Sequence, residues 1–351
     1  MKTLPIQTFT SDYPIYASNS IRGSLLHSAY CVIRGVVATA LLSVVAFNAI
    51  AQDKYPSRPI RMVTPFAPGG GSDILARLIG PRIHEAWGQS VVVDNRGGGG
   101  GTIGAAIVVN APPDGYTLIL VSGSYGSNAA LHKLPYDSVT GIKPIILIGE
   151  TGLIVTMHPN SPVKSIRDYI ESARANPGKF NFGSSGTGGL GHMAGELFML
   201  DTGVKLTHVP YKGTGPVMSA LLAGEVHTSF SSMVPAIPHI RNGKLRPIGI
   251  TPGRRWRNFP EVPSISETVP GFEVVHWYGI WGPKALPQRI VTRWNSEVAR
   301  IMKTEAMQKW FDNEGMEPAG GPPEQFANRI RTDVAKWQRV VREAKIPVSG
   351  A

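Results

Sequence analysis

Residues 61–77, RMVTPFAPGGGSDILAR, predict a strand, a glycine loop and the first turn of a helix. The three glycines 69–71 allow a sharp turn without side chains over the loop, and Ser72 or Asp73 suits the helix N-cap. The amino-terminal end of a helix carries roughly half a positive charge and donates backbone N–H groups to anions. The stretch therefore indicates either an anion cradle or a βα turn that only needs glycine.

The composition indicates a globular protein that is longer than one typical domain. The chain has 351 residues, of which 42% are hydrophobic and 17% charged, so two domains are expected. Its formal net charge is +11, but the basic residues are scattered and the only tight cluster is Arg254, Arg255 and Arg257. We therefore expect a basic solvated surface and no nucleic-acid partner.

Residues 1–51 read as a secretory signal peptide. The apolar run 35–51, GVVATALLSVVAFNAIA, follows Arg34 and ends in an A-x-A pattern that suits cleavage after Ala51. A membrane anchor is the alternative, although the run is short for a span. The only cysteine, Cys31, precedes the run, so a mature chain from Gln52 would contain no thiol. We expect an exported protein without disulfides.

Strands and helices alternate along the mature chain, which predicts an α/β fold with parallel strands and helical crossovers. The expected strands are residues 60–65, 91–94, 116–121, 143–149, 153–158, 179–183, 206–211, 228–233, 245–250 and 273–282. We place a first lobe at residues 52–149 and 252–351, and a second lobe at 150–251. Two amphipathic helices near the carboxyl end carry apolar stripes that predict packing against the core.

Three catalytic patterns can be weighed in this chain. Residues 186–191 form a literal G-x-G-x-x-G, but the strand that follows ends without the acid that would hold a ribose, so a nicotinamide-dependent oxidoreductase is the alternative function. Residues 183–187 miss the G-x-S-x-G of a serine hydrolase by one glycine. His192 and Glu196 lie one helical turn apart, but no third metal ligand follows at recognisable spacing.

Polar, glycine-rich loops open helices in both halves of the chain. They are residues 68–73, 97–102 and 122–127 in the first half, and 184–189, 212–215 and 231–232 in the second. Ligands bind at the carboxyl ends of strands in open α/β sheets, where such loops lie. Two lobes that each offer helix amino-terminal ends across a cleft would clamp a small anion, and this needs no nucleophile and no base.

Several of these motifs resemble the Bug-type receptors of tripartite tricarboxylate transporters. The similar stretches are YPSRPI at 55–60, PGGxxDxxAR at 68–77, DNR at 94–96, PDGYT at 113–117, GSSGxG at 183–188, HxAGEL at 192–197, HVPYKG at 208–213 and PEVP at 260–263. They occur in order over essentially the whole mature chain. The resemblance implies a monomeric, non-enzymatic periplasmic receptor of the two-lobe (type II, Venus flytrap) architecture, in which each lobe is a mainly parallel sheet flanked by helices.

The resemblance also implies the ligand and its contacts. A small carboxylate (a di- or tricarboxylate, an acidic amino acid or an aromatic acid) would be held in the interlobe cleft by backbone N–H groups, hydroxyls and waters, without a cofactor or metal, and delivered to the membrane subunits of a transporter. The contacts carried over are Phe66, Ala67, Gly69, Gly70, Asp73 and Ser122 in the first lobe, and Ser184, Thr187, Gly188 and Tyr211 in the second. Two positions depart from the family pattern: Gly189 replaces a hydroxyl residue and His227 an acid.

Overall fold

The computed structural model describes residues 55–343 and 346–348, and the predicted signal peptide, residues 1–51, lies outside them. The strands are β1 (Ile60–Thr64), β2 (Val91–Asn95), β3 (Thr117–Ser122), β4 (Ile142–Met157), β5 (Asn181–Ser184), β6 (Thr207–Pro210), β7 (Thr228–Ser232), β8 (Arg246–Ile250), β9 (Val275–Pro283) and β10 (Glu317–Pro318). The helices are α2 (Gly71–Trp87), α3 (Thr102–Val109), α4 (Ser124–Leu131), α5 (Ile166–Ala175), α6 (Leu190–Thr202), α7 (Thr214–Ala223), α8 (Met233–Arg241), α9 (Gln288–Met302), α10 (Glu305–Asn313) and α11 (Pro323–Glu343).

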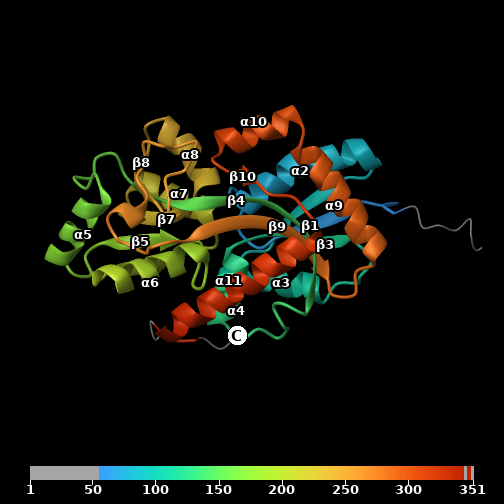
Figure 1. Cartoon of the computed structure of the whole chain (residues 1–351), viewed down its shortest axis with the longest axis horizontal. Coiled ribbons are helices and arrows are strands. Elements are labelled where there is room, and N and C mark those ends of the chain that lie inside the picture. Colours follow the sequence, from blue (N-terminus) through green and yellow to red (C-terminus); the bar gives the residue numbers. More distant parts are fainter. Residues whose placement is uncertain (1–54, 344–345, 349–351) are drawn as a thin grey trace, which may run out of the picture. The chain divides into compact units, whose positions relative to one another are not determined.

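The strands form one curled sheet with a parallel group at each end. β2, β1 and β3 pair in parallel at one end, and β6, β5 and β7 pair in parallel at the other. Between the two groups, β9 pairs antiparallel with β3 and β4, and β4 pairs antiparallel with β7 and β8 (Figure 1). The α/β two-lobe prediction is confirmed: the first lobe carries β1–β3 and the second lobe carries β5–β7.

The connection between the lobes differs from the prediction of two separate strands. β4 runs without a break through Glu150, Thr151 and Gly152. These residues pair with β9 at Trp277, His276 and Val275, so the ladder continues across the expected crossing. The expected parallel pairing of residues 245–250 is also wrong, because β8 pairs antiparallel with β4. Long antiparallel strands therefore join the two parallel groups.

Local helix boundaries differ from the prediction in two instructive places. Helix α2 begins at Gly71 with Gly70 as the N-cap and without a side-chain capping bond, so Ser72 and Asp73 lie in its first turn. Residues 124–131, expected to begin as a polar loop, form helix α4. Serine, glycine and asparagine favour helices weakly, but burial of most of α4 outweighs that preference. Both helices consequently start close to the ends of β1 and β3.

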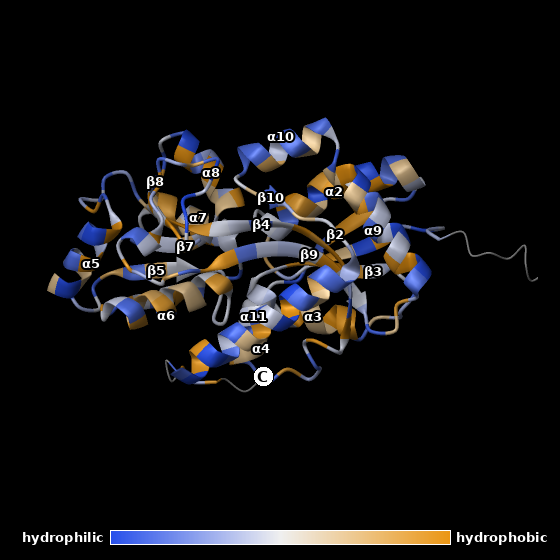
Figure 2. Ribbon diagram, in the orientation of Figure 1, coloured by the Kyte–Doolittle hydropathy of each residue, from blue (hydrophilic) through white to orange (hydrophobic). Residues whose placement is uncertain are grey.

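The core confirms the apolar stripes of the last helices. Ile290, Trp294 and Val298 of α9 are buried, as are Phe326 and Trp337 of α11. Figure 2 shows mixed hydrophobic and hydrophilic colouring along α9 and α11, as expected for helices with one buried face. In the part of the chain that the structure describes, no helix is both long and apolar enough to span a membrane.

Candidate ligand-binding site

A small cavity of about 30 Å³ lies where the two lobes meet. It holds about two water-sized spheres, which is room for a group such as a carboxylate. Polar residues dominate its lining. The lining residues are Phe66, Gly70, Gly71, Ser72, Ser122, Ser124, Leu153, Ser184, Ser185, Leu190, Gly191, Thr214, Phe230, Ser231, Ser232, His276 and Tyr278.

Five helices begin at this cavity. Gly71 opens α2, Ser124 opens α4, Leu190 opens α6 and Thr214 opens α7, while Ser232 is the N-cap of α8. Helix geometry leaves the first N–H groups of each helix without intrahelical partners, and the helix dipoles make this end positive. Among the described residues that line the cavity there is no lysine or arginine. The electrostatic attraction for an anion therefore comes from helix ends and hydroxyls.

The start of α2 requires glycine at position 71. A Cβ on Gly71 would overlap the phenolic ring of Tyr278, which is buried on β9. The Tyr278 hydroxyl in turn lies 2.5 Å from Ser232 Oγ, at the start of α8. One tyrosine thus touches the amino-terminal ends of two helices, one from each lobe.

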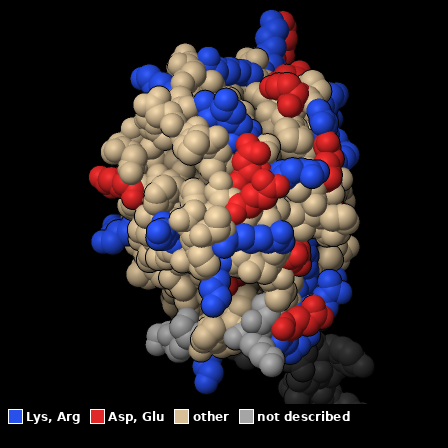
Figure 3. Space-filling view, turned by 90° about the vertical axis from the view of Figure 1, so that its left-hand side faces the viewer, with Lys and Arg blue, Asp and Glu red and all other residues tan. Residues whose placement is uncertain are grey.

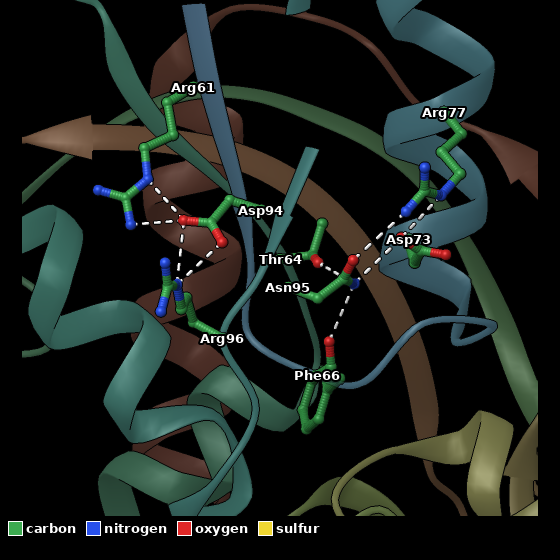
Figure 4. Close-up of polar contacts among 8 residues, drawn as sticks. All are labelled: Arg61, Thr64, Phe66, Asp73, Arg77, Asp94, Asn95 and Arg96. Carbon is green, nitrogen blue, oxygen red and sulfur yellow. Dashed lines mark hydrogen bonds and ion pairs between the residues drawn. The ribbon is translucent and has the colours of Figure 1, made fainter. Parts of the chain in front are cut away.

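The loop that precedes α2 is fixed by Asn95 (Figure 4). Asn95 Nδ2 donates to Thr64 Oγ1 at 2.7 Å, to the Phe66 carbonyl at 3.1 Å and to Asp73 Oδ1 at 3.0 Å. Asp73 Oδ2 accepts the Gly69 N–H at 3.0 Å, and Asp73 Oδ1 pairs with Arg77. Both carboxylate oxygens are thus engaged, so Asp73 shapes the loop.

The Asp73 carboxylate is charged in this setting. Burial alone would raise the pKa of Asp73, but the hydrogen bonds from Arg77, from the Gly69 N–H and from Asn95 together lower it. A second carboxylate belongs to Asp94, which precedes Asn95 at the end of β2. Asp94 bridges Arg61 and Arg96. The D-N-R motif at residues 94–96 therefore braces the β1–α2 loop from outside the cavity.

In the second lobe, Ser184 Oγ lies 2.6 Å from His208 Nε2. This distance suits a nucleophile and its base, but burial, and then the neighbouring His192 ring, lowers the pKa of His208 to about 3. A general base works best with a pKa near the operating pH. The contact with His208 accordingly orients the Ser184 hydroxyl at the cavity. A histidine with this pKa is a weak general base, so the pair does not favour serine hydrolase chemistry.

The loop between Ser184 and α6 is held by His192 and Glu196. His192 Nδ1 accepts the Gly188 N–H at 3.2 Å, and His192 Nε2 lies 3.3 Å from Glu196 Oε1. Within the described residues, no group of three or more histidine, cysteine, aspartate or glutamate side chains could hold a metal. The histidine and glutamate that the sequence suggested as a metal pair thus organise the Gly188 backbone.

The two lobes touch through hydrogen bonds around the cavity. The Ala67 N–H donates to the Lys212 carbonyl at 2.9 Å, and Ser127 Oγ donates to the Gly188 carbonyl at 2.7 Å. The Leu190 N–H donates to Ser124 Oγ at 3.1 Å. These contacts, together with the Tyr278 hydroxyl and Ser232, describe a closed arrangement of the lobes.

Four of the ten site residues expected from the sequence line the cavity: Phe66, Gly70, Ser122 and Ser184. The other six surround it. Ala67 and Gly69 lie at an outer groove, and the Asp73 carboxylate accepts the Gly69 N–H. The backbone of Gly188 forms hydrogen bonds with His192 and Ser127. Thr187 is exposed, and Tyr211 is partly exposed beside β5. Neither Gly189 nor His227 lines the cavity; His227 bonds to Asn181.

Sequence reasoning missed the contributions of Ser72, His276 and Tyr278. Ser72 Oγ and His276 Nδ1 are buried polar atoms without a hydrogen-bond partner among the described residues. Both side chains line the cavity. His276 and Tyr278 occupy an otherwise apolar, aromatic strand, and a polar residue in a buried strand is the signal that could have pointed to them.

The arginines that cluster at residues 254–257 lie beside carboxylates in the structure. Figure 3 shows basic and acidic side chains interspersed on one face. The arginines of the 254–257 cluster are each paired with a carboxylate: Arg254 with Glu317, Arg255 with Glu267 and Arg257 with Asp312. The tight basic cluster of the sequence is thus locally neutralised.

A two-lobe α/β fold with a polar cavity between the lobes is typical of periplasmic solute-binding proteins. The family model described as "Tripartite tricarboxylate transporter family receptor" matches residues 75–346, and this chain belongs to that family. The chain is 36% identical over 318 residues to the "UPF0065 protein in tcbD-tcbE intergenic region" of Pseudomonas sp. (strain P51), covering 89% of this chain and 95% of that protein. The Bug-type resemblance is confirmed.

Solved structures of similar proteins share the fold. Rpa4515 of R. palustris with adipate superposes with a TM-score of 0.80 at 35% identity, covering 85% of this chain and 100% of the other. The periplasmic binding protein BugD superposes with a TM-score of 0.80 at 30% identity over 85% and 100%. MatC of Rhodopseudomonas palustris with bound malate has a TM-score of 0.79 at 30% identity over 82% and 100%.

Proposed function

We propose that this protein binds a small carboxylate in the interlobe cavity and closes around it. The observation that carries the proposal is the convergence of five helix amino-terminal ends on a cavity whose described lining contains hydroxyls but neither lysine nor arginine. Backbone N–H groups at helix ends stabilise anions without a cationic side chain. The similar proteins that hold adipate and malate support a carboxylate as the anion.

In this proposal the predicted residues divide into contacts and supports. Phe66, Gly70, Ser122 and Ser184 contact the ligand, together with Ser72 of the α2 first turn. Ala67, Gly69, Asp73, Thr187, Gly188 and Tyr211 hold the loops in place, as the bonds of Asp73 to Gly69 and of His192 to Gly188 suggest. The carboxylate would receive N–H groups from α2 and α6 and hydroxyls from both lobes.

We further infer that the protein is a receptor without catalytic activity, delivering its ligand to transporter membrane subunits. The low pKa of His208 argues against hydrolysis through Ser184. The alternative, nicotinamide binding by residues 186–191, is disfavoured because a Cβ on Gly188 would fall 2.5 Å from Asn128 Oδ1, so the loop is packed against the first lobe. Membership of a transporter receptor family supports the delivery role.

The proposal includes export and hinge closure. We propose cleavage after Ala51, a first lobe of residues 52–149 and 252–351, and a second lobe of residues 150–251. A few residues near Gly152 and Pro252 would absorb the rotation, because β4 crosses between the lobes at Gly152 and Pro252 lies against that residue. A monomer is sufficient for this cycle, because both walls of the cavity come from one chain.

Titration calorimetry with adipate, malate, citrate, aspartate, benzoate and NAD tests the proposal. At least one carboxylate should bind and NAD should not. Ser184→Ala removes a hydroxyl from the cavity and should raise the dissociation constant roughly 10- to 150-fold, as for a hydrogen bond to a charged group. The matched control Ser296→Ala, at an exposed position of α9, should leave it unchanged. Binding of NAD but of no carboxylate would refute the proposal.

A further inference from the structure

A second cavity lies within the first lobe, next to the cavity between the lobes. Its volume is about 10 Å³, which is room for one water-sized sphere or a methyl group. All of its lining comes from residues 65–136, so the first lobe alone forms it. We call it the apolar compartment, because most of its lining is apolar or aromatic and includes Phe66, Ala105, Val121, Tyr125, Leu134 and Tyr136.

The apolar compartment offers little to a second charged group. Its lining, all of it described, contains no charged side chain. Two of its polar side chains are already engaged: the Tyr125 hydroxyl donates to the Ser138 carbonyl at 2.7 Å, and Asn128 Nδ2 donates to the Gly100 carbonyl. Burying a charge without a partner is costly, whereas burying a methyl or methylene group is favourable. The compartment therefore suits the apolar part of a ligand.

The Phe66 ring connects the two spaces. Phe66 and Ser122 line both the cavity between the lobes and the apolar compartment. At the base of the ring, a Cβ on Gly213 of the second lobe would lie 3.2 Å from Phe66 Cβ. At its far end, a Cβ on Gly101 of the first lobe would lie 3.2 Å from Phe66 Cζ. The ring thus extends from the boundary between the lobes into the first lobe.

Strand β3 and helix α4 also carry both linings. At the end of β3, Val121 lines the apolar compartment and Ser122 lines both spaces. At the start of α4, Ser124 lines the cavity between the lobes and Tyr125 lines the compartment. Consecutive Cα atoms are about 3.8 Å apart, so the two linings meet within the length of a short acid.

We propose that the ligand is a short monocarboxylic acid, whose carboxylate lies in the cavity between the lobes and whose apolar chain lies along Phe66 in the apolar compartment. This inference rests on the proposed carboxylate-binding function and names the class of acid. The charged end faces hydroxyls and helix ends, and the apolar end is removed from water. The small volumes of both spaces limit the chain to a few carbon atoms.

Titration calorimetry with matched acids tests the inference. Succinate is butyrate with its terminal methyl group replaced by a carboxylate, and malonate is related to propionate in the same way. Each monocarboxylate should bind roughly 5- to 150-fold more tightly than its partner, the range for burying a polar group without a hydrogen bond. Affinity should also rise from acetate to butyrate, about fourfold for each methylene that enters the apolar compartment.

Two variants change the size of the apolar compartment. Ala105→Val fills part of it from α3 and should weaken the binding of butyrate more than that of acetate. Ala106→Val is the matched control, because this neighbouring, partly exposed residue lines neither space and should change neither affinity. Leu134→Ala enlarges the compartment at a partly exposed position and should shift the preference toward pentanoate.

Several results would overturn the inference and leave the proposed function intact. These are a dicarboxylate that binds as tightly as its matched monocarboxylate, binding of dicarboxylates alone, and equal affinity for acetate, propionate and butyrate. Equal losses for acetate and butyrate in Ala105→Val would also overturn it. If that variant does not fold by circular dichroism, an unchanged chain-length preference in Leu134→Ala has the same meaning. Failure of every carboxylate to bind, adipate and malate included, would instead refute the proposed function.

Discussion

The phenolic oxygen of Tyr278 lies 2.5 Å from Ser232 Oγ and joins the first lobe to the second at the cavity. Tyr278 sits on β9, opposite Ser122 of β3, whereas Ser232 ends β7 and caps α8. Burial raises the pKa of Tyr278, although the hydrogen bond with Ser232 offsets part of this, so the hydroxyl keeps its proton. In the proposed closure of the lobes, this contact would form together with the cavity.

Tyr278→Phe should weaken ligand binding while keeping the fold. A neutral hydrogen bond contributes about 0.5–1.5 kcal/mol net, so the dissociation constant should rise roughly 2- to 13-fold. Titration calorimetry measures this change. Tyr116→Phe is the matched control, because its hydroxyl bonds to Ser57 away from the cavity. An equal loss of affinity in both variants would contradict a role for the Tyr278 contact in closure.

Gly71→Ala should destabilise the closed protein. The new Cβ would overlap the Tyr278 ring, and overpacking of this kind typically costs about 1–3 kcal/mol. Gly70→Ala is the neighbouring control: its Cβ would meet the Ala67 carbonyl oxygen at an ordinary 3.7 Å. Urea unfolding of both variants in the absence of ligand compares them. If Gly70→Ala were the more destabilised, the described approach of Tyr278 to α2 would be wrong.

Ser72 lines the cavity, whereas Thr187 is exposed, so variants of these two residues compare a lining position with an exposed one. Ser72→Ala should raise the dissociation constant roughly 10- to 150-fold, because Ser72 lines the cavity and its hydroxyl has no hydrogen-bond partner among the described residues. The Thr187 side chain is exposed and absent from the lining, so Thr187→Val should change affinity less than about twofold. A larger loss of affinity in Thr187→Val than in Ser72→Ala would instead indicate that the anion binds at the exposed loop that carries Thr187.

Acid should destabilise the fold through two histidines. Burial lowers the folded-state pKa of both His208 and His276 from 6.5 to about 3. Between about pH 3 and pH 6.5 these histidines bind protons in the unfolded chain but not in the folded chain. Their contribution to the free energy of unfolding is therefore fully present above pH 6.5 and decreases as the pH is lowered. His276→Asn should reduce the slope of the unfolding free energy against pH.

Much of the fold could be predicted because apolar strands and helices alternate visibly. β1, β2 and β3 follow from short apolar runs separated by turn residues. The start of α4 at Ser124 could not be predicted, because Ser124, Gly126 and Ser127 favour turns locally, whereas the structure buries them in the helix. The continuity of β4 was also missed, since pairing with β9 is a long-range contact that no local pattern at Gly152 reveals.

The site was predictable only where it follows strand ends. Phe66 and Gly70 lie in the loop after β1, Ser122 and Ser184 are the last residues of β3 and β5, and all four line the cavity. His276 and Tyr278 enter the site from the middle of β9. Their position depends on the register of β9 between β3 and β4, which the sequence of β9 alone does not specify.

Backbone amide shifts measured by ¹⁵N–¹H correlation spectroscopy during titration with a bound carboxylate test the central claim most directly. If helix ends hold the anion, the N–H resonances of Gly71, Ser72 and Gly191 should move downfield and saturate with the dissociation constant found by calorimetry. Amides of the exposed α9 surface, such as Ser296, should not move. Saturating shifts confined to residues away from the cavity, with Gly71, Ser72 and Gly191 unchanged, would contradict the anion site described for this protein.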